Sequence, residues 1–271
     1  MTEKKQYRMG YVILFFVAAA ILIPAAVMLV WIFTERWAWP DLIPQVFSLR
    51  ALSEIMGRKE EMAGLFASSI FISTVVALLS VIIGIMTTRA LVFYRFFGRK
   101  VMSFFTVLPF MVPATVFAMG IQVTFIRMGL NNTVVGVIIA HLICSLPYAV
   151  RLLQDGTEAV GKKLEEQARV LGAGPGTAFL KVTIPMLAPV ILSAASMSYI
   201  VSFSQYFLTL LIGGGNIRTF TIVMVPYLQG GDRNIACIYS TFFLGVTLLV
   251  FWVFELLAGR WIKNTGGDYY S

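Results

Sequence analysis

Few residues in this sequence could do catalytic or metal-binding chemistry, and their spacing does not bring them together. The chain of 271 residues has one histidine, His141, and two cysteines, Cys144 and Cys237. It has no Ser-His-Asp set, His–Cys cluster or His-Glu-x-x-His motif, the patterns that nucleophilic and zinc-dependent catalysis require. The cysteines indicate neither a disulfide framework nor a metal-binding pair. We therefore expect no catalytic site, no metal site and no cofactor.

His141 lies in a stretch, 133–150, that carries no charged residue. A buried histidine in such a segment usually forms hydrogen bonds to a neighbouring helix, and we favour a neutral ring in that role. A proton-relay role is the alternative, since ionisable residues inside membrane segments often carry protons.

The glycine-rich run Gly-Ala-Gly-Pro-Gly-Thr-Ala-Phe at residues 172–179 superficially resembles a phosphate-binding loop. It lacks the Lys-Ser/Thr pair that must follow the last glycine, and no strand pattern precedes it. We therefore expect the chain to bind no nucleotide by this device.

The segment 164–185 is the most polar passage in the middle of the chain, and it is patterned. Leu164, Ala168 and Leu171 fall at i, i+4 and i+7, which predicts a short helix with one apolar stripe. Gly172 would allow a left-handed stop, and a second short helix is expected at about 177–182. Pro185 is expected to break the chain again. Such a helix-turn-helix could lie on lipid or fit a groove on a cytoplasmic partner.

The rest of the sequence consists of elements that would position this loop in a membrane. The residues are 59% hydrophobic and 13% charged, against about 25% charged in a soluble domain. Blocks of about 18 residues or more are long enough to cross about 30 Å of hydrocarbon as helices. We expect an all-α integral membrane protein with six spans, at 11–33, 65–88, 101–126, 133–150, 186–212 and 235–254. The first block is too long for the apolar region of a signal peptide, so we expect it to be retained.

Basic residues predict the orientation of these spans. The side that holds both termini, the 89–100 turn and the 151–185 loop carries 14 Lys and Arg, and the other side carries 7. Cytoplasmic loops are the basic ones, so both termini are expected in the cytoplasm. The net charge of +8 then reflects membrane topology, and we expect no nucleic-acid partner.

The 164–185 loop resembles the EAA signature of permease subunits of bacterial type I ATP-binding cassette importers, the methionine-permease-like class. Glu166-Gln167-Ala168 is followed after three residues by Gly172 and after nine more by Val182-Thr183-Ile184-Pro185. The spacing is that of the signature, with Gln167 in place of its first alanine. Residues 68–91 and 219–228 also look like segments of this family's permease core.

The resemblance implies a domain organisation and a set of partners. Two permeases, which we expect to be two different chains, would form one translocation path in the bacterial inner membrane. A cytoplasmic ATPase dimer would dock on their loops, so that the ATPase activity resides in a partner and this chain is not an enzyme. An extracytoplasmic binding protein would deliver the substrate. The implied parts are a tail at 1–10, a first span at 11–33, an outer loop at 34–64, a core at 65–258 that contains the coupling loop 151–185, and a tail at 259–271.

The resemblance also assigns roles to residues. Glu166 would contact the ATPase, Gly172 would make the turn, and Pro185 would set the angle of the next span; the other ATPase-coupling positions are Gln167, Ala168 and Ile184. Separately, Ser198, Ser202 and Gln205 share one helical face and are expected to line the path, or else simply to pack helices.

The substrate is the least determined part of this interpretation. The chain looks most like permeases of the polyamine, thiamine, iron and phosphonate cluster, which favours a polyamine and leaves the other three as alternatives. The cores of the expected spans contain no carboxylate that could bind a polycation, which counts against a polyamine. The same absence counts against a secondary carrier, which normally keeps ionisable groups at mid-membrane. A carrier and a membrane scaffold remain the alternatives of other classes.

Overall fold

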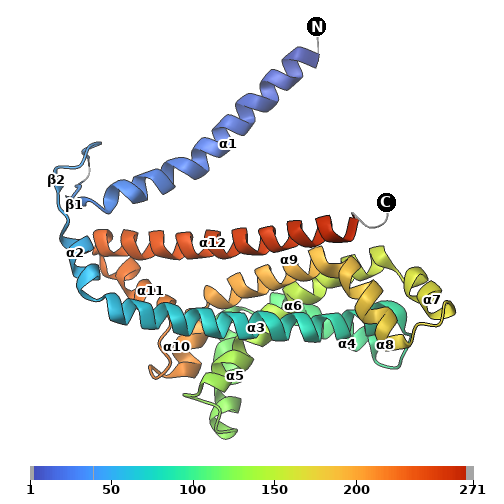
Figure 1. Ribbon diagram of the computed structural model, residues 1–271. Coiled ribbons are helices and arrows are strands. Elements are labelled where there is room, and N and C mark those ends of the chain that lie inside the picture. The colour runs from blue at the N-terminus through green and yellow to red at the C-terminus, as the bar shows by residue number, and fades with distance from the viewer. Residues whose placement is uncertain (1–2, 39, 267–271) are drawn as a thin grey trace. The chain divides into compact units, whose positions relative to one another are not determined.

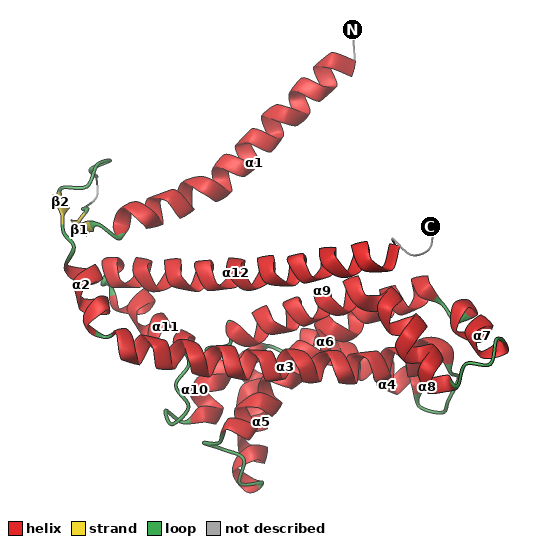
Figure 2. Ribbon diagram, in the orientation of Figure 1, coloured by secondary structure: helices red, strands yellow, loops and turns green. Residues whose placement is uncertain are grey.

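The computed structural model describes residues 3–38 and 40–266, most of them in helices (Figures 1 and 2). The chain forms two compact units. The first contains residues 1–63 and 223–245, and the second contains 64–222 and 246–271. The expected tails 1–10 and 259–271 are partly helical, because α1 begins at Glu3 and α12 runs to Gly266. Residues 1–2 and 267–271 of those tails lie outside the described residues.

The first unit combines a long apolar helix with a short hairpin. It contains α1 (Glu3–Trp31), β1 (Thr34–Arg36), β2 (Val46–Phe47) and α2 (Arg50–Gly57), and the two strands pair antiparallel. None of the residues in the most apolar part of the 22-residue stretch of α1 is buried within the chain, as expected of a helix surrounded by lipid. Trp31 and Trp37 stack with ring centroids 5.4 Å apart just after this stretch ends, in the manner of tryptophans at a membrane interface.

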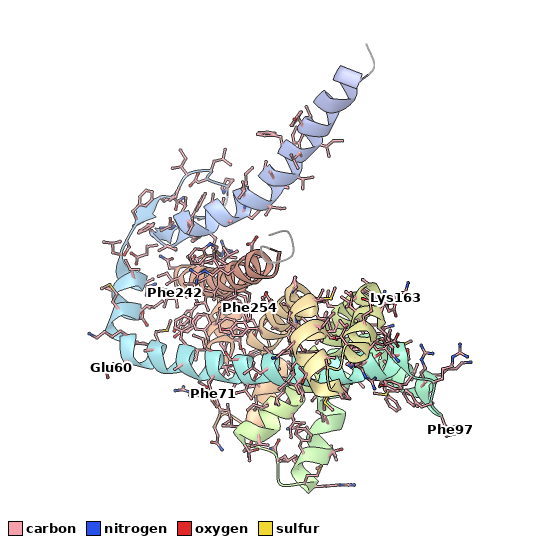
Figure 3. The ribbon with its side chains drawn as sticks, turned by 45° about the vertical axis from the view of Figure 1, so that its right-hand side comes forward. Glu60, Phe71, Phe97, Lys163, Phe242 and Phe254 are labelled. Carbon is pink, nitrogen blue, oxygen red and sulfur yellow. The ribbon has the colours of Figure 1, made fainter. Side chains whose placement is uncertain are left out.

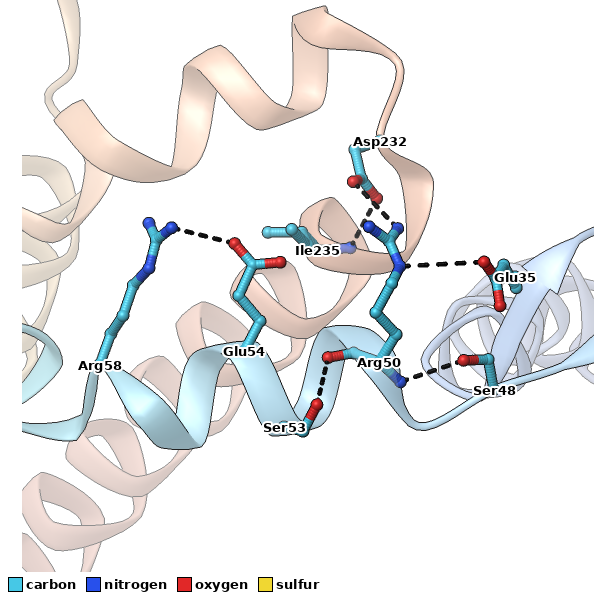
Figure 4. A network of polar contacts seen from close by, with 8 residues as sticks. All are labelled: Glu35, Ser48, Arg50, Ser53, Glu54, Arg58, Asp232 and Ile235. Atoms are coloured by element: carbon cyan, nitrogen blue, oxygen red, sulfur yellow. Dashed lines mark hydrogen bonds and ion pairs between the residues drawn. The ribbon is translucent and has the colours of Figure 1, made fainter.

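An arginine network holds the hairpin to α2 and to the start of α12 (Arg233–Gly266) in this unit (Figure 4). The guanidinium of Arg50 lies 3.3 Å from a carboxylate oxygen of Asp232 and 4.0 Å from one of Glu35. Arg58 pairs with Glu54 at 3.0 Å. All these side chains are about a third or more exposed, so each pair contributes at most about 1 kcal/mol.

The second unit is built around two long helices, α6 (Val134–Val160) and α9 (Ile184–Phe203), which pack against each other. The other elements of this part are most of α3 (Lys59–Phe93), α4 (Arg99–Met111), α5 (Ala114–Arg127), α7 (Lys163–Val170), α8 (Pro175–Ala178), η1 (Phe179–Thr183), α10 (Phe207–Gly213), the start of α11 (Phe220–Gly230) and α12 from residue 246 onward. One apolar cluster joins α3 to α5, α6 and α10, and another joins α3 to α6 and α9. Elsewhere large apolar side chains stay exposed, such as Phe71 at 60% and Phe97 at 106% (Figure 3).

The expected count of six spans is not confirmed. Five of the described helices are long and apolar enough to cross a membrane: 10–31, 59–93, 134–160, 175–203 and 233–257. The expected third span, 101–126, is two shorter helices, α4 and α5, that meet at extended Val112 and Pro113. A proline disfavours helical backbone at the residue before it and lacks the N–H that a continuous helix needs. The expected fifth span also ends early, at Phe203, and α10 follows after a short break.

Candidate coupling site

The loop between α6 and α9 carries the short helix predicted from its apolar spacing, and Gly172 ends this helix as predicted. Gly172 has a φ of +93°, in the left-handed region. Its N–H donates to the carbonyl of Arg169 at 3.1 Å, and that of Ala173 donates to the carbonyl of Ala168 at 3.0 Å. This pair of bonds is the Schellman motif, which satisfies carbonyls that the end of α7 would otherwise leave unpaired.

The prediction that Pro185 breaks the chain is wrong. From Pro175 the backbone runs through α8 and the π-helix η1 into α9 without leaving a helical conformation. The N–H of Ile184 donates five residues back, to the carbonyl of Phe179. This wider turn accommodates Pro185, whose ring would clash with a regular preceding turn. Ile184 and Pro185 therefore lie in the first turn of α9 and continue the loop into it without a break.

The outer side of α7 is an open, shallow surface, here called the docking surface, made of Lys163, Glu166, Gln167, Val170 and Leu171. Val170 and Leu171 are each 88% exposed, whereas Ala168 is half-buried. Lys163 is exposed at the first residue of α7 (Figure 3). The apolar stripe therefore differs from the predicted one, because Val170 belongs to the exposed side and Ala168 faces the rest of the loop. Two large apolar side chains beside a carboxylate suit a protein partner with an apolar groove.

The sequence reasoning missed Glu165, whose carboxylate holds the inner side of α7. Arg89 of α3 donates two hydrogen bonds to it, at 2.8 and 3.0 Å, and the hydroxyl of Thr183 donates a third at 2.7 Å. The hydrogen bonds from Arg89 hold the pKa of Glu165 below its usual range. The stabilisation is therefore present at neutral pH and is lost as the pH falls through this lowered pKa.

The polar side chains expected to line the path lie inside the protomer. Ser198 and Ser202 are 0% and 2% exposed, and Gln205 is half-buried. Ser202 bonds to Nδ1 of His141 at 2.9 Å, and the hydroxyl of Ser198 has no hydrogen-bond partner among the described residues. This arrangement favours the helix-packing alternative for Ser202.

His141 joins three helices through its two ring nitrogens. Its Nε2 lies 2.9 Å from the hydroxyl oxygen of Thr209, and its Nδ1 lies 2.9 Å from that of Ser202. The Thr209 hydroxyl donates its proton to the carbonyl of Gln205 at 2.8 Å, so it accepts from Nε2–H. These contacts give His141 the helix-joining hydrogen bonds of the favoured interpretation. Groups of three or more metal-ligating side chains are absent from the described residues.

A bundle of apolar helices that presents an exposed amphipathic loop fits a membrane transport subunit that couples to another protein. The chain belongs to the family of binding-protein-dependent transport system inner membrane components, whose family model matches residues 80–263. This agrees with the resemblance carried by the EAA-like spacing. The protein is therefore an ATP-binding cassette importer permease with a mainly helical, multi-pass membrane fold.

The chain is similar to permeases for molybdate or tungstate and for sulfate. It is 28% identical over 190 residues to the molybdate/tungstate transport system permease protein WtpB of Thermococcus kodakarensis, covering 69% of this chain and 76% of that one. It is 24% identical over 272 residues to the sulfate transport system permease protein CysT of Escherichia coli, covering 94% and 92%. A crystal structure of a bacterial ABC transporter involved in alginate import has the same fold, with a TM-score of 0.70 at 15% identity over 95% and 96% of the two chains. None of the three is named for a polyamine, thiamine, iron or phosphonate, so these substrates gain no support from them.

Proposed function

We propose that this chain forms half of an importer's translocation path and receives the force of ATP hydrolysis through its docking surface. The observation that carries the proposal is the exposure of Val170 and Leu171, 88% each, at the end of a helix that also presents Glu166. Burial of one leucine side chain contributes about 1.5–3 kcal/mol, so this pair could anchor a cytoplasmic ATPase. Gln167 would lie at the edge of the contact.

The partners follow from the same proposal. A cytoplasmic ATPase dimer would dock on the loops of two permeases, the second permease being a different chain, and an extracytoplasmic binding protein would deliver the substrate from the opposite side. The catalytic activity then belongs to the ATPase. Both termini would be cytoplasmic, which the 14-to-7 asymmetry of basic residues supports. Residues 65–258 would be the transport core.

Disruption of the docking surface should release the ATPase. Leu171→Asp places a charge where an apolar contact is expected, so the affinity for the ATPase should fall at least about tenfold. Glu166→Lys should weaken docking by reversing a charge. The measurement is the amount of ATPase that co-purifies with the tagged permease.

The matched control is Leu42→Asp, because Leu42 is also 88% exposed but lies in the loop between β1 and β2. The control should retain the ATPase at the wild-type level. Equal retention in the Leu171 and Leu42 variants would overturn the docking proposal. The view that the loop lies on lipid would then take its place.

For the substrate, we propose a tetrahedral oxyanion of the molybdate, tungstate or sulfate type in place of a polyamine. Similarity to a sulfate permease over 94% of this chain, and to a molybdate/tungstate permease over 69%, supports this class. The span cores also lack a carboxylate that could receive a polycation. In both cases the binding protein would do most of the selecting.

The substrate class can be measured with the assembled transporter in proteoliposomes. Tungstate, molybdate or sulfate, presented with the binding protein, should raise the ATPase rate severalfold, and spermidine should not. Chloride at the same ionic strength is the control for general salt effects. Stimulation by spermidine without any response to the oxyanions would reject the proposed class and restore the polyamine expectation.

The family match favours an importer permease over the secondary carrier and the membrane scaffold. Among the described residues of the second unit, His141 and Tyr199 are buried ionisable groups, and the hydrogen bonds of His141 already use both ring nitrogens. A scaffold would hold its partners without any substrate-dependent change in ATP hydrolysis, so the stimulation experiment also distinguishes it from an importer.

A further inference from the structure

The coupling helix α7 lies between two glycines with left-handed backbone. Gly161, directly after α6, has a φ of +65°, and Gly172, two residues after the end of α7, has a φ of +93°. A Cβ atom added at either position would meet nothing within 4 Å, so neither glycine packs closely against another element. The side-chain contacts of α7 are what attach it to the neighbouring helices.

One carboxylate supplies the main attachment. Glu165 on α7 binds Arg89 near the end of α3 through two hydrogen bonds and Thr183 at the end of η1 through a third. The side chains of Arg89 and Glu165 are only 20% and 13% exposed. A two-point arginine–carboxylate pair fixes direction as well as distance, and this ideal geometry distinguishes it from the exposed ion pairs that contribute little.

Aromatic contacts complete this attachment. The guanidinium of Arg89 lies 4.6 Å from the ring centroid of Phe179, within the range of a cation–π interaction. The ammonium of Lys162, just before α7, donates to the carbonyl of Phe93 at 3.2 Å and lies 4.6 Å from the ring of Tyr94. The start of α7 is therefore attached to the end of α3 through Arg89 and Phe93. It is also attached through Thr183 and Phe179 to η1, which continues into α9.

We propose that Arg89, Glu165 and Thr183 form a brace that transmits the movement of the docked loop into α3 and α9. Glu165 and Arg89 are positioning residues, and they act through the orientation of α7. Neighbouring Glu166 points to the docking surface and belongs to the contact with the partner. The brace rests on the proposed docking function. It gives the two adjacent glutamates different roles: Glu166 binds the ATPase, and Glu165 transmits the movement of the ATPase to the permease.

The brace can be tested in the assembled transporter. Glu165→Ala and Arg89→Ala should keep the ATPase bound during purification but lower the ratio of substrate-stimulated to basal ATP hydrolysis about tenfold, within the usual range of coupling between sites. The exchange Arg89→Glu with Glu165→Arg should restore part of the ratio, which a merely misfolded loop would not do. Glu166→Lys is the contrast, because it should lose the bound ATPase itself.

A measurement on the permease alone separates failure of the brace from failure of docking. Spin labels at Val170 of α7 and at Leu78 of α3, exposed by 88% and 59%, should give a narrow distance distribution in the otherwise native chain. Glu165→Ala should broaden it, and Glu165→Asp should broaden it less.

An unchanged distribution, or an unchanged stimulation ratio, would overturn the brace. Loss of the ATPase from the Glu165 variants would do the same, since Glu165 would then act in docking. Failure of the native chain to hold any ATPase would reject the proposed function, and the distance measurement would still decide the brace.

Discussion

Replacement of Gly172 by valine is expected to lower substrate-stimulated ATP hydrolysis at least about tenfold while the protein inserts at normal levels. Gly172 has a φ of +93°, which costs a residue with a Cβ atom about 1–2 kcal/mol and a β-branched residue more. The new side chain would meet no atom within 4 Å, so the effect comes from the backbone alone. The turn must change, and α7 then presents its docking surface in a different direction.

A graded series separates strain from size. Asparagine tolerates positive φ better than other side chains, so Gly172→Asn should retain more activity than Gly172→Val although its side chain is no smaller. The matched control is Gly176→Val, because Gly176 also has free space at its Cβ position but lies within α8 and has no positive φ. The measurements are the stimulated rate in proteoliposomes and the amount of co-purified ATPase. If Gly172→Val and Gly176→Val behave alike, the left-handed turn is not what coupling requires.

The local features of this loop were predictable because each depends on residues close in sequence. The i, i+4, i+7 spacing of apolar residues implies α7, and a glycine after it implies the left-handed stop, whatever the rest of the chain does. The spacing from Glu166 through Gly172 to Pro185 likewise needs no tertiary information, and membership of the importer family confirms that resemblance. The coupling role of these residues remains a proposal.

The brace could not be predicted because its two charged residues are 76 positions apart. Glu165 and Glu166 are adjacent and chemically equal, and only the rotational position of α7 against the end of α3 decides which one meets Arg89. The sequence also did not determine which prolines interrupt a helix. Pro113 separates α4 from α5, whereas Pro185 follows a π-helical turn and lies within a continuous helix. The difference depends on whether the turn before the proline can adopt the wider π-helical geometry, and the amino-acid composition does not show this.

The polar contacts in the interior of the second unit were predictable only in part. A neutral, hydrogen-bonded His141 was the favoured expectation, because an unpaired polar group is costly in an apolar bundle. Its partners Ser202 and Thr209 lie on α9 and α10, and the break between those helices, within the expected fifth span, was not foreseen. The sequence therefore predicts the type of interaction but not the residues that satisfy it.

Gly156→Ala is expected to destabilise the second unit more than its single methyl group suggests. Gly156 of α6 faces Val190 of α9, and an added Cβ atom would lie 2.8 and 2.9 Å from the two γ-carbons of Val190. Valine is restricted to few rotamers in a helix, so the two helices would have to move apart. Overpacking of this kind costs about 1–3 kcal/mol, and small residues are what allow membrane helices to approach closely. The melting temperature of the purified permease in detergent should fall by several degrees.

Val190→Ala supplies the compensating change. Alone it should destabilise the protein by removal of two methyl groups from the α6–α9 contact, but combined with Gly156→Ala it should restore much of the lost stability, because the new methyl group fills the space. The two effects should therefore be strongly non-additive, as expected of residues in contact. Gly120→Ala is the control, since Gly120 lies within α5 with no atom near its Cβ position, and alanine there favours the helix by up to about 1 kcal/mol. Additive changes in melting temperature in the Gly156 and Val190 double variant, or a Gly156→Ala protein as stable as Gly120→Ala, would show that the close approach of α6 and α9 does not determine the packing of this core.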